Sequence, residues 1–170
     1  MSESASKRDV TAVIGAGGIG QAIARRISSG RHILVANHTQ ASAEAAAKVL
    51  EGAGFEVTAM QADIADRTAV QAVVAKAQSL GAIKVLVQAA GVSPSQAPIE
   101  AILQVDLYGT AVLLEEFGKV IAEGGSGVVI SSQSGYRMPA LTAQQDALLA
   151  TASPEALLEL DFATDATRFT

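Results

Sequence analysis

Three glycines in this chain have the spacing of a phosphate-binding turn. Gly15, Gly17 and Gly20 follow an apolar run in a Gly-x-Gly-x-x-Gly pattern, and helical spacing begins directly after them. The first glycine permits a tight turn, the second lets backbone approach a pyrophosphate, and the third lets a helix pack closely on a strand. The free N–H groups and dipole of that helix favour an anion. We predict a dinucleotide-binding loop that includes Gly18 and Ile19, the alternative being a glycine-rich turn without a ligand.

Polar residues follow the next apolar run, where dinucleotide-binding folds select their cofactor. An acidic residue there binds the ribose hydroxyls of NAD and repels the extra phosphate of NADP. This chain has Asn37, His38 and Thr39 at that place. Asn37 is neutral, and His38 and Thr39 can donate hydrogen bonds to a phosphate. The pattern therefore favours NADP over NAD, with a solvated turn residue as the alternative for His38.

Two further groups of candidate cofactor-binding residues follow the third and fourth apolar runs. Asp63, with Ile64 beside it, is placed to accept a hydrogen bond from an adenine amino group. The small residues Ala89, Ala90 and Gly91 would let backbone approach a flat ring or a ribose. We expect both groups at the nucleotide.

Hydroxyl side chains gather after the fifth apolar run, among them Ser132 and Tyr136. They would lie at the catalytic edge of a sheet. Tyr136 has three interpretations: it lines a substrate pocket, it replaces a missing acid, or it packs as a loop aromatic against the following helix.

The elements that must position these residues alternate along the chain. Segments with helical spacing separate apolar runs of strand length at 11–15, 32–36, 55–60, 83–88 and 127–132. Such alternation predicts an α/β fold, a doubly wound parallel sheet with helices on both faces and strand order 3-2-1-4-5. A ligand then sits at the carboxyl ends of the strands, beside the first strand.

Three regions follow from this pattern. Residues 1–10 are a polar tail, 11–136 a dinucleotide-binding domain, and 137–170 a helical insertion or the start of a substrate region. Within the last region Ser153 and Pro154 predict a helix start, as N-cap and first helical residue. Asp66 is the predicted cap of the helix that begins near Arg67.

Composition excludes several classes of function. The formal net charge of −5 argues against nucleic-acid binding, which needs clustered Lys and Arg. The absence of cysteine excludes disulfides and thiolate metal sites, and we predict no metal. The chain has no apolar signal region and no run long enough to span a bilayer. We expect a cytoplasmic protein without membrane partners.

Taken in order, these sites resemble the short-chain dehydrogenase/reductase family over residues 11–136. Asp63 is similar to the adenine-binding aspartate of the family, and Ser132 to the serine that holds the substrate carbonyl. Ala90 and Gly91 match the end of an Asn-Asn-Ala-Gly motif, with Gln88 and Ala89 at the asparagine positions. The glycine loop is one residue shorter than the usual Gly-x-x-x-Gly-x-Gly form.

Two departures from the family pattern concern proton transfer. Asp106 stands where the family has an asparagine, although a carboxylate can also accept a hydrogen bond from water. The family's Tyr-x-x-x-Lys pair has no match, because Tyr136 is followed four residues later by Ala140 and no lysine occurs after Lys119.

The resemblance implies an NADP- or NAD-dependent oxidoreductase that transfers a hydride between nicotinamide and an alcohol or carbonyl substrate. The fold is then truncated relative to the family, with the Tyr/Lys pair beyond residue 170 and the 170-residue chain inactive by itself. A homodimer or homotetramer is expected, with the apolar helix at 102–121 serving both core and interface. The alternative is a dinucleotide-binding sensor or scaffold without catalysis.

Overall fold

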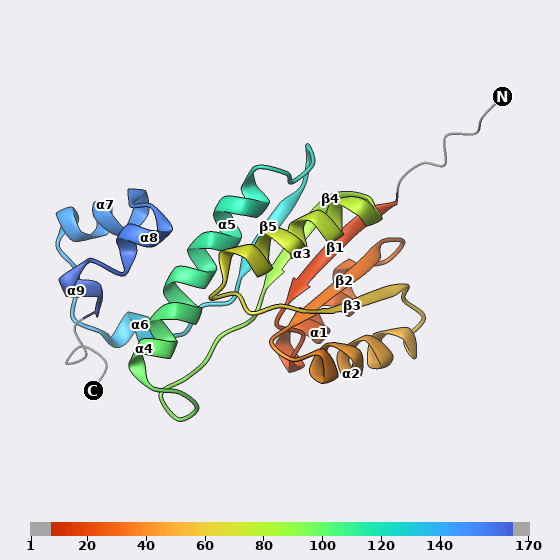
Figure 1. Ribbon diagram of the computed structural model, residues 1–170, viewed down its shortest axis with the longest axis horizontal. Coiled ribbons are helices and arrows are strands. Elements are labelled where there is room, and N and C mark those ends of the chain that lie inside the picture. The colour runs from red at the N-terminus through yellow and green to blue at the C-terminus, as the bar shows by residue number, and fades with distance from the viewer. Residues whose placement is uncertain (1–7, 165–170) are drawn as a thin grey trace.

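The computed structural model describes residues 8–164, and its centre is a parallel five-stranded sheet. The strand order β3-β2-β1-β4-β5 confirms the predicted order (Figure 1). The strands are β1 (Asp9–Ile14), β2 (His32–Asn37), β3 (Val57–Gln61), β4 (Ala82–Gln88) and β5 (Ser126–Val129). The chain order reverses between β1 and β4, which places a switch point beside β1. Most of the predicted polar tail lies outside the described residues.

Four helices cover the two faces of the sheet: α1 (Gly18–Ile27), α2 (Gln40–Glu51), α3 (Arg67–Leu80) and α5 (Thr110–Gly118). Side chains of α1 and α2 pack with Val13, Ile33 and Val35 on one face. Those of α3 and α5 pack with Ala12 and other strand residues on the opposite face. Ala, Val, Ile and Leu form most of both cores, as expected for a chain with 4% aromatic residues.

The predicted long helix at 102–121 is three consecutive pieces. A single turn, α4 (Ile99–Ile102), continues into the π-helical stretch η1 (Leu103–Gly109) and then into α5. Within α5, Leu113 is fully buried while Leu114 is 48% exposed. Neighbouring leucines therefore point to the core and to the surface, as the sequence indicated.

Strand β5 is the least covered part of the sheet. Among the described residues it pairs only with β4, and all its residues are exposed. Val128 lies in register with Val87, so it faces the same side as the α1–α2 core, beyond the reach of those helices. The predicted strand at 127–132 stops at Val129, although the Ile130 N–H still donates to the Gln88 carbonyl at 2.8 Å.

Four short helices follow β5 and form what we call the helical segment (residues 134–164). They are α6 (Ser134–Arg137), α7 (Ala143–Thr151), α8 (Pro154–Leu157) and α9 (Asp161–Thr164). Figure 1 shows them at one end of the molecule, beyond α5. Pro154 and Leu157 are its buried residues, and the Ser153 hydroxyl caps α8 as predicted, accepting the Ala156 N–H at 3.3 Å. No helix within residues 8–164 is long and apolar enough to cross a membrane.

Candidate dinucleotide site

The glycine loop after β1 is closely packed at its two ends. Gly15 has φ +79°, and a Cβ there would lie 2.2 Å from the Ala90 nitrogen. A Cβ at Gly20 would lie 2.4 Å from the Gly15 carbonyl oxygen. Glycine is therefore required at Gly15 by conformation and space, and at Gly20 by the close approach of α1 to the loop.

The middle of the loop faces open space. A Cβ at Gly17 or Gly18 would meet nothing within 4 Å. Gly17 is the extended N-cap residue of α1, and no side chain caps the helix there. The first N–H groups of α1, which include that of Ile19, thus have no side-chain acceptor. This open cradle of backbone donors fits a pyrophosphate.

Asn37 holds the glycine loop in place from the end of β2. Its side-chain oxygen accepts a hydrogen bond from the Ala16 N–H at 2.7 Å. From the other side, the Gln21 amide donates to the Ala16 carbonyl at 2.8 Å. The amide oxygen of Asn37 therefore points to the glycine loop. Its NH₂ group points away from that bond and can donate to a ligand. Sequence reasoning treated Asn37 only as a neutral residue at the position that selects the cofactor, and it missed this bond to the loop.

His38 and Asp63 lie next to each other at the ends of β2 and β3. His38 Nε2 is 3.7 Å from Asp63 Oδ2, and the side chains are 77% and 49% exposed. Asp63 Oδ1 accepts the Ala65 N–H at 3.0 Å, which fixes the carboxylate. The ends of β2 and β3 therefore place a ring nitrogen of His38 beside the carboxylate acceptor of Asp63.

These strand ends enclose a small pocket of about 90 Å³, called here the nucleotide pocket. Of the predicted cofactor residues, the pocket is lined by Gly15, Asn37, His38, Asp63, Ile64 and Ala90. Thr39 does not line it, since its hydroxyl caps α2 by accepting the Ser42 N–H at 3.2 Å.

The loop after β4 is shaped by the buried side chain of Gln88. Its amide oxygen accepts the Ala90 N–H at 3.2 Å, and its NH₂ donates to the Ala90 carbonyl and the Thr110 hydroxyl. The Ala89 N–H donates to the Ile14 carbonyl at 2.8 Å. These bonds fix the loop against both β1 and α5. The sequence flagged Gln88 only as a departure from a motif.

Asp106 lies on η1, next to the same loop. Its Oδ1 accepts the Val92 N–H at 3.0 Å, and a Cβ at Gly91 would come within 3.2 Å of that oxygen. Burial raises the pKa of the Asp106 carboxyl, an effect that the Val92 N–H opposes. One oxygen of Asp106 is thus bound to the loop. A further hydrogen-bond donor or a positive charge near the carboxyl group would stabilise its charged form.

Ser132 and Tyr136 both lie in the stretch after β5. The Ser132 oxygen accepts the Ser134 N–H at 3.1 Å, which leaves the hydroxyl proton free to donate. Tyr136 is 93% exposed, so it does not pack against the following helix.

A second and much larger hollow, of about 770 Å³, lies between η1 and the helical segment and is called here the apolar cavity. Asp106 and Tyr136 both line it, whereas Ser132 is not among its lining residues. The apolar side chains around it include Ile102, Leu107, Met138, Leu141 and Leu149.

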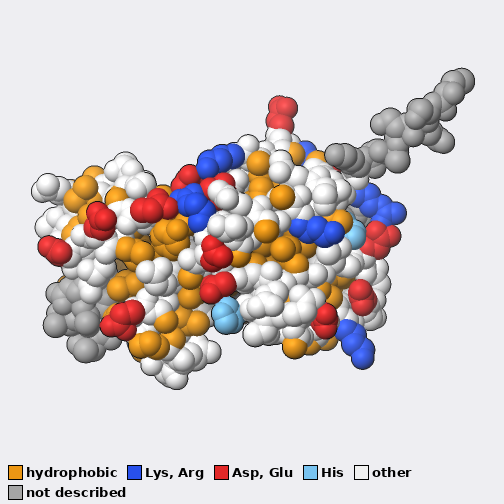
Figure 2. Space-filling model, viewed as in Figure 1, with side chains coloured by type: hydrophobic (Ala, Val, Ile, Leu, Met, Phe, Trp, Pro, Cys, Tyr) orange, Lys and Arg blue, Asp and Glu red, His pale blue; other side chains and the backbone are white. Residues whose placement is uncertain are grey.

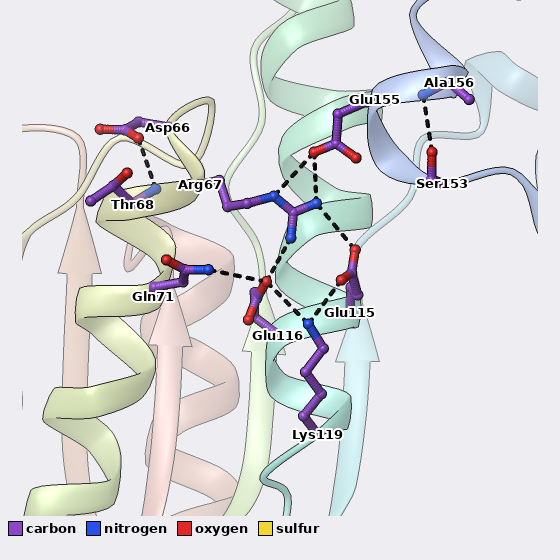
Figure 3. A network of polar contacts seen from close by, with 10 residues as sticks. All are labelled: Asp66, Arg67, Thr68, Gln71, Glu115, Glu116, Lys119, Ser153, Glu155 and Ala156. Atoms are coloured by element: carbon purple, nitrogen blue, oxygen red, sulfur yellow. Dashed lines mark hydrogen bonds and ion pairs between the residues drawn. The ribbon is translucent and has the colours of Figure 1, made fainter.

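One arginine joins the helical segment to the domain (Figure 3). Arg67, at the start of α3, donates to Glu116 at 2.6 Å, to Glu155 at 2.8 Å and to Glu115 at 3.1 Å. Lys119 bonds Glu115 and Glu116 but not Glu155. We call these five residues the Arg67 cluster. Hydrogen bonds, first to Glu115 and then to Glu155, raise the pKa of Arg67.

The sequence predicted the helix cap beside Arg67 but not the ion pairs of the Arg67 cluster. Asp66 caps α3 as predicted, accepting the Thr68 N–H at 2.8 Å. The partners of Arg67 are up to 88 positions away in the chain, so no local pattern marks them. Within the described residues no group of three His, Asp or Glu side chains could hold a metal ion.

Comparisons with known proteins agree with this geometry. The family model described as short chain dehydrogenase matches residues 9–144. A short-chain dehydrogenase/reductase, bsc3, from Alternaria brassicicola is 43% identical over 126 residues, covering 74% of this chain and 46% of that protein. The chain thus spans about half the length of this curated relative.

Solved structures show the same likeness. A short-chain dehydrogenase/reductase from Serratia marcescens matches with TM-score 0.66 and 27% identity, over 96% of this chain and 69% of that one. A 3-oxoacyl-[acyl-carrier protein] reductase from Brucella melitensis matches with TM-score 0.63 and 28% identity, over 76% and 59%. With the glycine loop and the sheet order, these matches show that the chain belongs to the short-chain dehydrogenase family.

Proposed function

We propose that this chain is the dinucleotide-binding part of an oxidoreductase that uses NADP, or less favourably NAD, on an alcohol or carbonyl substrate. The observation that carries the proposal is the open backbone at Gly17 and Gly18 in the loop whose Gly15 lines the nucleotide pocket together with Asn37 and Asp63. A bound nicotinamide dinucleotide supplies the hydride chemistry of such enzymes.

Each residue then has a distinct task in binding. The N–H groups of Gly17, Gly18 and Ile19 receive the pyrophosphate, and Asp63 accepts a hydrogen bond from the adenine amino group. The NH₂ group of Asn37 faces the ribose. His38 donates to a 2′-phosphate, with Thr39 nearby at the start of α2. The neutral backbone of Ala89, Ala90 and Gly91 lets a flat ring lie against the loop.

On the substrate side, Ser132 donates its free hydroxyl proton to the substrate oxygen. Asp106 accepts a hydrogen bond from water at the asparagine position of the family, and Tyr136 lies at the substrate. The predicted boundary of the tail at residue 10 was wrong, because Asp9 and Val10 belong to β1; the cofactor domain then runs to residue 136, and 137–170 act as the start of the substrate region. A cytoplasmic homodimer or homotetramer completes the proposal, with exposed Leu114 of α5 at the subunit contact.

Titration with NADPH and NADH tests the binding site. Gly17→Val should abolish binding of both, because the new side chain fills the space for the pyrophosphate. Gly118→Val is the matched control, since Gly118 also faces open space but lies at the end of α5. Retained affinity in Gly17→Val, with the control unchanged, would contradict the proposal.

Asn37→Asp tests the cofactor preference. Aspartate keeps the acceptor for the Ala16 N–H and adds a negative charge beside the ribose. Like charges repel, and solvent screens them at this partly exposed position, so NADPH should bind about tenfold more weakly, a cost of about 1.4 kcal/mol, while NADH binding is kept. A wild-type protein that binds NADH more tightly than NADPH would contradict the roles of Asn37 and His38.

A further inference from the structure

The apolar cavity differs from the nucleotide pocket in size and in chemistry. Its volume of about 770 Å³ falls in the range of small-molecule sites, whereas the nucleotide pocket has only about 90 Å³. On the face drawn in Figure 2, hydrophobic side chains gather where the helical segment meets the rest of the molecule, with Asp and Glu side chains around them and Lys and Arg side chains at their upper edge. The cavity can therefore bury the apolar body of a ligand.

One helical stretch separates the two sites. Val105 of η1 lines the nucleotide pocket, and the next residue, Asp106, lines the apolar cavity. Val92 also lines the nucleotide pocket while its N–H holds Asp106 Oδ1. A molecule in the cavity thus lies one helix away from the place proposed for the cofactor.

The opposite wall of the cavity belongs to the helical segment. Met138, Leu141 and Leu149 contribute apolar surface, and Asp146 of α7 contributes a second carboxylate. This wall is held in place by α8, whose Leu157 is buried and whose Glu155 bonds Arg67. The cavity therefore depends on the docked helical segment.

The charges around the cavity have one sign. Among the described residues that line it, Asp106 and Asp146 are the charged ones, and there is no Lys, Arg or His. Asp146 is exposed, whereas the carboxylate of Asp106 is partly desolvated and its Oδ1 accepts the Val92 N–H. Within the described chain no ion pair is formed by either of them. Such a lining attracts a cation and repels carboxylates and phosphates.

We propose that the apolar cavity binds a hydrophobic molecule that carries an ammonium group, with the ammonium at Asp106 and Asp146. Resting on the proposed function, this molecule is the alcohol or carbonyl substrate, an apolar amino alcohol or amino ketone whose oxygen extends out of the cavity to Ser132. The raised pKa of Asp106 supports this choice, because a bound cation would stabilise the carboxylate that burial disfavours.

Three matched probes test the ligand class by calorimetry at pH 7. 1-Adamantanemethylamine, 1-adamantanemethanol and 1-adamantanecarboxylate share one rigid apolar body and differ in charge. The amine should bind about tenfold more tightly than the alcohol, as expected for one charge-assisted contact, and the carboxylate more weakly than either. Equal affinities, or tightest binding of the carboxylate, would overturn the proposal.

Charge-neutral variants locate the ammonium. Asp146→Asn should weaken the amine several-fold and leave the alcohol unchanged. Asp161→Asn is the matched control, because it removes the same charge from the helical segment at a residue outside the cavity lining. An equal loss in both variants would mean that only the overall field attracts the amine, and would overturn the assigned position.

NADPH titration of the same samples separates this proposal from the proposed function. NADPH binding without saturable amine binding overturns the cavity proposal and leaves the dinucleotide site standing. Amine binding without binding of either dinucleotide overturns the proposed function and leaves the ligand class of the cavity standing. Because the probe series uses the unmodified protein, it does not depend on how any variant folds.

Discussion

The sheet domain and the helical segment are held together in opposite ways. In the domain, whole strands such as β1 and β2 lie between two layers of helices, and residues like Leu34 and Phe117 are almost completely buried. In the helical segment, Pro154 and Leu157 alone are buried among its described residues, and Glu155 adds an ion pair with Arg67. The nucleotide pocket thus stands on a packed core, whereas the apolar cavity depends on a weakly attached wall.

The largest effect is expected from a cavity in the core of the domain. Leu34→Ala should lower the free energy of unfolding by about 3 kcal/mol, because a fully buried leucine side chain is lost from the central sheet. Urea denaturation followed by circular dichroism measures this loss. The control is Leu148→Ala, at a leucine that is 41% exposed, where a change below about 0.5 kcal/mol is expected.

A smaller and local effect is expected from Leu157→Ala. Leu157 is 4% exposed and anchors α8, so its truncation should loosen the helical segment by about 2 kcal/mol. Amide hydrogen exchange should speed up in α7–α9 while β1 and β2 keep their protection. If exchange rises equally in the sheet, the two regions unfold as one unit and the contrast between them is wrong.

Arg67→Gln should weaken the same attachment without touching the apolar contacts. Exchange in α8 should rise by about threefold to tenfold, a modest effect because Glu155 is 59% exposed and water weakens the pair. Lys119→Gln is the matched control, since it removes a positive charge that bonds Glu115 and Glu116 but not Glu155. The same rise in both variants would contradict a specific role for Arg67.

Acid should produce the smallest change, in the same place. The pKa of Glu155 is lowered by its own backbone hydrogen bond and then by Arg67, and that of Glu115 by Lys119 and then by Arg67. A carboxyl with a lowered pKa in the folded state stabilises it above the ordinary pKa and loses this contribution as pH falls. Protection of α8 should therefore decrease on acidification below the usual glutamate range, and Glu155→Gln should reduce this dependence.

Much of the domain could be predicted because its signals are local. Each buried strand is a short apolar run, each covering helix repeats its apolar residues at helical spacing, and Asp66 and Ser153 mark helix starts. The expected end of the last strand was wrong. The predicted strand continued past the apolar residues through Ser131 and Ser132, but the pairing of β5 with β4 reaches only Val129, opposite Gln88.

The rest could not be predicted because it depends on contacts between distant residues. Nothing near Arg67 indicates that Glu155 will be its partner, and nothing near Asp106 indicates that Asp146 lines the same cavity. The bond from Ala16 to Asn37 is of the same kind, since it forms only when β1 and β2 pair. The capping box of Thr142 and Gln145 was readable from its spacing and was missed.

The π-helical stretch η1 determines how the side chains of α4 and the first part of η1 are rotated about the helix axis relative to those of α5. A π turn holds more residues than an α turn, so everything before it is rotated relative to α5. Removing one residue from η1 would return this continuous helix to an ordinary helical phase. Leu113 and Phe117 would keep their places in the core, while Val105 would turn from the nucleotide pocket toward the surface that Asp106 faces now. The extra residue of η1 thus decides which side chain faces the nucleotide pocket and which faces the apolar cavity.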